Sequence, residues 1–136
     1  MGKRNQQYNS TLGNTIGDAI DALENFTSEV RESADNMSET FPGAERTERY
    51  ESAADELEGI ETDTEVPDAL IDVAVSFTQD ERKGISKGAQ LGNLVDWFAA
   101  IADAAEDASA GTEDEDLQAY VDQLREAAEA LQGIEL

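Results

Sequence analysis

The chain has 136 residues, with 32 Asp and Glu against 9 Lys and Arg, and a formal net charge of -23. A charge of this sign repels nucleic acid and anionic membranes and attracts basic protein surfaces. The absence of Cys and His excludes disulfides, thiolate nucleophiles and the commonest acid–base and metal-binding side chains. The length suits a single domain over residues 1–136, and 39% hydrophobic residues are enough for one core.

The first residues carry two cations and no apolar stretch, so we expect residues 1–8 to be flexible or extended. They lack the features of a secretory signal, and no run in the sequence approaches the ~18 apolar residues of a membrane span. These features favour the cytoplasm of a host cell.

Apolar residues at alternating steps of four and three predict a long helix with a coiled-coil-like seam over residues 12–37. Phe41, Pro42 and Gly43 should end it, because Pro restricts the residue before it and Gly turns freely. The seam favours burial within one bundle, and pairing with a second copy as a homodimer is the alternative. Its residues are Leu12, Ile16, Ala19, Leu23, Phe26, Val30, Ser33 and Met37.

A second helix is predicted around residues 50–57, with Gly59 at its end. The apolar run of residues 68–77 follows Pro67, which suits the first position of a helix. We favour a helix there, but the run is short and partly β-branched, so periodicity leaves helix and strand open.

Two further helices are predicted at residues 91–108 and from Glu113 onward, where Thr112 suits the cap. Trp97 and Phe98 are adjacent on the first of them and cannot both face one core.

Two sequence echoes suggest a duplication: residues 53–61 return as 127–135, and residues 12–14 return as 91–93. The halves would be residues 10–61 and 90–135, with chance similarity between acidic helices as the alternative. We therefore expect an all-α fold, a bundle of about four to five helices that could be two duplicated helical hairpins.

The sequence offers no catalytic constellation, and we expect no enzyme activity, cofactor or metal site. Its carboxylates fall on polar helix faces or in loops instead of forming a buried pair. The acid-rich run from Glu61 lacks the Gly and Glu of a calcium-binding loop at the required positions.

Residues 35–58 contain Asp35-Asn36, a Gly43 turn and an acidic Ala/Leu helix, and they resemble a pattern in small acidic proteins of phages and plasmids. The pattern covers about a fifth of the chain and departs at Ser38 and at Phe41-Pro42. Most such proteins have no known activity, so the resemblance implies a mobile-element origin.

By charge, size and helix content, the chain is also similar in type to phage proteins that imitate DNA to disable restriction or CRISPR enzymes. DNA carries one charge per ~3.4 Å along each strand, and acids every three or four helical residues lie ~4.5–6 Å apart. Such rows would occupy the basic groove of a nucleic-acid-binding protein, without binding nucleic acid or membrane. The candidate partner-binding residues are Asp18, Asp21, Glu24, Glu29, Glu32, Asp35 and Glu39, with Asp122, Glu126 and Glu129.

High-salt cytoplasm is the alternative explanation, because it also favours surfaces rich in Asp and Glu and poor in Lys. The chain has only three Lys. In that case it would be a haloarchaeal or haloviral structural or assembly protein, located in the virion.

Overall fold

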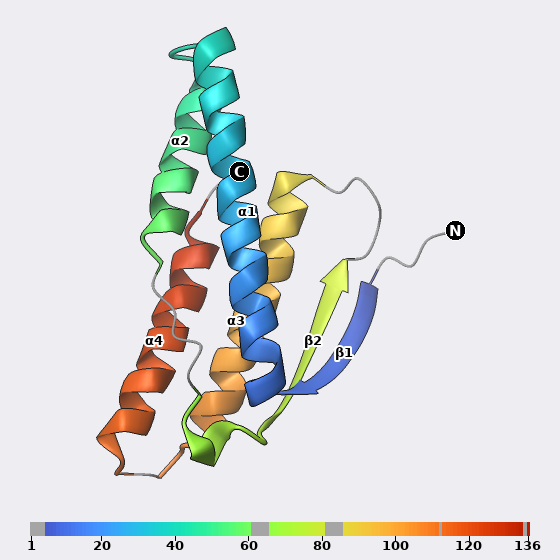
Figure 1. Ribbon diagram of the computed structural model, residues 1–136, viewed down its shortest axis with the longest axis vertical. Helices are drawn as coiled ribbons and strands as arrows, with labels where there is room; N and C mark the ends of the chain where they lie inside the picture. The colour runs from blue at the N-terminus through green and yellow to red at the C-terminus, as the bar shows by residue number, and fades with distance from the viewer. Residues whose placement is uncertain (1–4, 61–65, 81–85, 112, 135) are drawn as a thin grey trace.

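The computed structural model describes residues 5–60, 66–80, 86–111, 113–134 and 136 (Figure 1). Within these residues the chain forms four α-helices, one short 3-10 turn and a sheet of two strands. In chain order the elements are β1 (Asn5–Thr11), α1 (Leu12–Thr40), α2 (Glu45–Glu58), the turn η1 (Asp68–Leu70), β2 (Ala74–Asp80), α3 (Lys87–Ala108) and α4 (Glu115–Gln132).

The helices form a bundle, as the periodicity predicts. α2 packs along the second half of α1, α4 packs along α3, and α1 and α3 join the two pairs. α2 and α4 follow one another end to end on one side of the molecule, and the sheet lies on the opposite side (Figure 1). All four helices contribute to one apolar core.

The long first helix is confirmed, and its seam is buried within the single chain. Residues from Leu12 to Ala34 on the apolar face are buried, and Ser33 and Met37 are half-buried. Gly43, at a φ of 81°, makes the turn into α2 where the sequence predicts the break. A second copy of the chain could therefore meet α1 only through its exposed acidic face.

The prediction of an all-α fold is wrong in one region. Residues 68–77 form a 3-10 turn and a strand instead of a helix, and β2 pairs antiparallel with β1 from Asn5↔Asp80 to Thr11↔Ala74. The polar sequence of β1, Asn-Gln-Gln-Tyr-Asn-Ser-Thr, has no apolar alternation to identify it as a strand. Without a recognised pairing partner, β2 could not be told from a helix. Of the residues expected to be flexible or extended, 1–8, the structure describes 5–8, which lie in β1.

An aromatic stack attaches the sheet to the helices. The Phe77 ring lies between Tyr8 and Trp97, with centroids 5.4 and 4.9 Å away. Trp97 Nε1 donates a 2.8 Å hydrogen bond to Oγ1 of the buried Thr15. Trp97 therefore lies beneath the sheet, and its neighbour Phe98 is fully buried in the helical core.

The helix caps agree with the sequence in part. Asp114 caps α4, because its side chain accepts hydrogen bonds from the backbone N–H groups of Asp116 and Leu117. The predicted cap, Thr112, lies outside the described residues. Gly59 and Gly133 end α2 and α4 as predicted, with the same φ of -83° and ψ of -8°. The two echoed sequences thus end their helices alike, without the left-handed turn expected of a terminating Gly.

Candidate functional site

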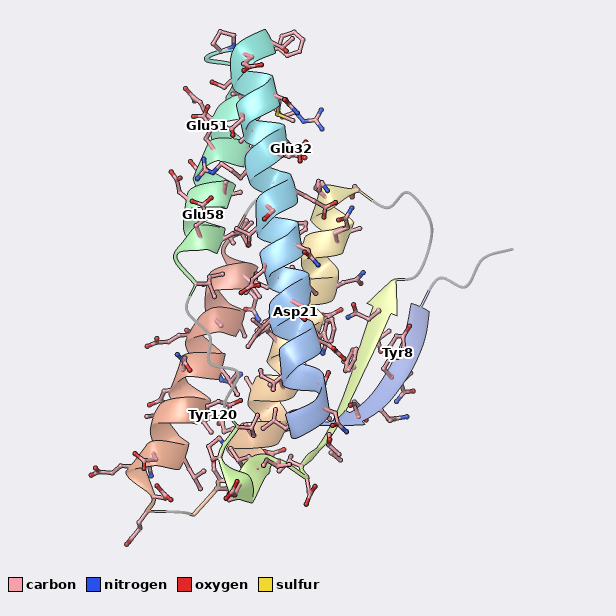
Figure 2. The ribbon with its side chains drawn as sticks, viewed as in Figure 1. Tyr8, Asp21, Glu32, Glu51, Glu58 and Tyr120 are labelled. Atoms are coloured by element: carbon pink, nitrogen blue, oxygen red, sulfur yellow. The ribbon has the colours of Figure 1, made fainter. Side chains whose placement is uncertain are left out.

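The predicted acidic row on α1 is one exposed face of that helix. All seven of its carboxylates are exposed. With ~100° per residue they fall within an arc of about 140°, opposite the buried side, and they extend ~32 Å from Asp18 to Glu39. Figure 2 shows two of them, Asp21 and Glu32, along this helix.

Three acids of this row line an open groove of about 730 Å³ between α1 and α2. Glu24, Glu32 and Asp35 come from α1, and Glu58 comes from α2. The apolar side chains that line the same groove are Leu23, Leu57 and Ile60. The groove therefore combines negative charge with an apolar surface.

The shorter predicted row lies in a second groove, of about 810 Å³, between α4 and the end of α2. Asp122, Glu126 and Glu129 all line it and are exposed. Ile60 lines both grooves, so the two acidic grooves adjoin at the end of α2. The remaining four acids of the α1 row, Asp18, Asp21, Glu29 and Glu39, line neither groove.

Sequence reasoning missed the acids that α2 supplies. Glu58 lines the first groove and Glu56 lines the second. Glu48, Glu51, Asp55 and Glu58 follow one another at steps of three, four and three, the same spacing that identifies the α1 row. Figure 2 shows Glu51 and Glu58 on this helix. The same spacing rule applied to residues 48–58 would have found Glu58 but not Glu56.

In each pair of packed helices, one Arg of one helix forms ion pairs with acids of the other. Arg31 of α1 donates to Asp55 at 2.5 Å and to Glu58 at 2.8 Å, and this hydrogen bond lowers the pKa of Glu58. Arg125 of α4 pairs with Glu106 and, at 3.0 Å, with Asp103 of α3. The hydrogen bonds to those carboxylates raise the pKa of both guanidinium groups.

The other described cations are held locally. Lys87 lies 3.5 Å from Glu29 and above the Phe26 ring, and Arg49 lies 3.8 Å from Glu45. Arg46 lies over the Tyr50 ring. No cation among the described residues forms an ion pair with Glu24, Glu32 or Asp35. Arg31 also lines the first groove, but its ion pairs are with acids of α2.

The charge is distributed unevenly between two sides of the molecule. Among the described residues, the segments 5–17, 73–80 and 86–95 hold one acid, Asp80, and one cation, Lys87. These segments form the sheet, the first turns of α1 and the first half of α3. The outward sheet face is exposed and uncharged at Gln7, Asn9, Ala74, Ser76 and Thr78.

The described residues hold no cluster of three or more carboxylates placed to bind a metal ion. The acid-rich run of Glu61, Asp63 and Glu65 lies outside them. None of the helices described is both long and apolar enough to cross a bilayer.

No protein-family model matches this chain, and neither the curated proteins nor the solved structures contain a significant match to it.

Proposed function

We propose that this chain is a non-enzymatic mimic of nucleic acid that occupies the basic DNA- or RNA-binding surface of a host defence enzyme, of the restriction or CRISPR class. The observation that carries the proposal is that three acids of the α1 row and the three acids of the α4 row line two adjoining grooves. A basic surface that normally neutralises phosphates would meet carboxylates there at comparable intervals.

The apolar lining of the first groove supports a protein partner over loosely bound cations. Leu23, Leu57 and Ile60 lie among its acids. Arg and Lys carry long aliphatic stems that pack on apolar surface while their charged heads contact carboxylates. A partner that presents such side chains would use both properties of the groove.

The uneven distribution of charge supports recognition of a partner over adaptation of the whole surface to high salt. Adaptation to salt acts on every exposed surface, whereas here the sheet side is nearly free of acids. Concentrated negative charge on the remaining surface would steer a basic partner toward the helices.

A salt-adapted structural or assembly protein is the second candidate. It is favoured by the exposed acids of α3, at Asp96, Asp103, Glu106 and Asp107, which line neither groove. Such a protein would need molar salt to fold, since its self-repulsion is screened only there. Its helical circular-dichroism signal would be lost in dilute buffer, whereas a mimic keeps that signal.

The test is competition with duplex DNA for a panel of restriction and CRISPR enzymes. A mimic displaces DNA from at least one of them, and its affinity falls steeply as salt rises. Replacing Glu24, Glu32 and Asp35 by the corresponding amides should weaken this competition at least tenfold.

The matched control replaces three exposed acids that line neither groove, Asp96, Asp107 and Glu113, by their amides. It changes the net charge by the same amount and should weaken competition less than threefold. Equal effects of the two triple variants would show attraction by net charge alone and would contradict a groove-specific site.

A further inference from the structure

β1 is an edge strand without the features that keep edges from pairing. It pairs with β2 on one side, and no described element flanks its other side (Figure 1). Alternate residues of such a strand direct N–H and C=O groups outward. Bulges, Pro and charged side chains commonly protect an edge strand from pairing. The seven residues of β1 pair in unbroken register and include no Pro and no charged side chain.

This edge is also where two copies of the chain can approach one another. Each copy carries a net charge of -23, and no acid occurs before Asp18. Elsewhere the helices present carboxylates that would face carboxylates of the second copy. The uncharged side chains of β1 impose no such repulsion.

The aromatic stack beneath the sheet ends at this edge. Trp97 and Phe77 are half-buried, whereas Tyr8 is 38% exposed, although its side chain is on the inward sheet face with Val75 and Phe77. Tyr8 is the middle residue of β1. A ring added next to it would extend the stack and cover its exposed surface.

We propose that β1 pairs antiparallel with β1 of a second copy, with Tyr8 opposite Tyr8 on the two-fold axis, to form a four-stranded sheet. This register pairs all seven residues of each strand. It places Gln7 opposite Asn9 of the second copy and continues the aromatic stack across the axis. The inference does not depend on the proposed function, and it replaces the α1 seam, which is buried, as the surface of a homodimer.

The dimer should be reversible and should strengthen with salt. Seven residues on each strand bury less than the ~1,200 Å² typical of stable complexes, and two chains of the same charge repel. At 1 M salt the Debye length is ~3 Å, so this repulsion is largely screened. Binding of a basic partner by the grooves has the opposite salt dependence, which separates the two interactions.

Sedimentation equilibrium of the full chain at low salt and at 1 M NaCl is the first test. We expect a monomer of 14.7 kDa in dilute buffer and a mass approaching twice that value at 1 M salt. A monomer under both conditions at millimolar protein concentration would overturn the proposal.

Paired variants test the register. At ~0.15 M NaCl the Debye length of ~8 Å leaves charges ~5 Å apart coupled. Under these conditions Gln7→Glu with Asn9→Glu sets like charges opposite each other at two places in the dimer, and should raise its Kd roughly tenfold. Gln7→Lys with Asn9→Glu sets opposite charges there, and should return the Kd to within about threefold of the parent. Gln7 and Asn9 are exposed in the monomer, and circular dichroism checks that each variant folds.

A double-Glu variant with the parent's Kd would assign the dimer to another surface. Failure of the Lys–Glu variant to recover the dimer would contradict the antiparallel register. Either result overturns the proposal.

Discussion

The helical side and the sheet side of this molecule differ in surface charge, in the side chains they expose and in the contacts that hold them together. The four helices carry 22 of the 32 Asp and Glu and open two acidic grooves, whereas the sheet exposes uncharged polar groups and one half-covered aromatic ring. A uniform solvent requirement would have given both sides the same surface. In our proposals the helical side meets a basic partner and the sheet side meets a second copy of the chain.

The two sides also differ in how they are held together, and adjacent residues test this difference. Phe98→Ala should cost about 3–5 kcal/mol of unfolding free energy, because its fully buried ring leaves a cavity in the helical core. Trp97→Phe keeps the stack and removes the hydrogen bond to Thr15, so it should cost about 1–2 kcal/mol. Urea unfolding measures both. Equal costs would show that the sheet attachment is as essential as the core.

Two glycines of α1 give the next largest effect, with opposite signs. A Cβ on Gly13 would lie 2.9 Å from Ile71 Cγ2 and 3.1 Å from its carbonyl oxygen, where the segment before β2 crosses α1. Gly13→Ala should therefore lower stability by ~1 kcal/mol. Gly17 has open space around it, and Gly17→Ala should raise stability by about 0.5–1 kcal/mol. Thermal unfolding of the two variants would refute the close crossing if both were stabilised.

The smallest expected effect concerns the ion pair at the edge of the first groove. Arg31 lowers the pKa of Glu58 below its ordinary 4.5. The folded state therefore gains stability from this pair above pH 4.5, and loses it as the pH falls through the lower folded pKa. Arg31→Met should return the Glu58 midpoint to its ordinary range in a carboxyl NMR titration. An unchanged midpoint would mean that Arg31 does not bind Glu58 in solution.

The sequence predicts the helical side far better than the sheet side. The 3.6-residue periodicity of apolar residues predicts helices α1, α2 and α4, and Phe41-Pro42-Gly43, Gly59 and Gly133 indicate where they end. β1 consists of polar residues, and its pairing with β2 joins segments about 70 residues apart, which no local pattern encodes. The sequence therefore favours a helix over residues 68–77 and leaves a strand open, and the structure has η1 and β2 there.

The sequence predicts the rows of acidic residues in the candidate site, but not the grooves that they line. Helical spacing places the carboxylates of α1 on one face, and the structure confirms that they are exposed there. Which of them lie beside the α2 acids depends on how α2 packs on α1, and where the two grooves adjoin depends on how α2 and α4 meet near Ile60. The acid-free first 17 residues were visible in the sequence, but their significance required knowing that β1 forms an exposed edge.

The most direct test of the difference between the two sides is an NMR titration of the labelled protein with a nine-residue oligoarginine peptide at low and high salt. We expect the largest amide shifts around the two grooves, at Thr27, Ser28, Asn36, Ile60 and Gln123, with β1 and β2 unchanged and the shifts abolished by 1 M NaCl. Shifts of equal size along the acidic face of α3 would show attraction to net charge alone, and would contradict a partner-binding surface built at the grooves.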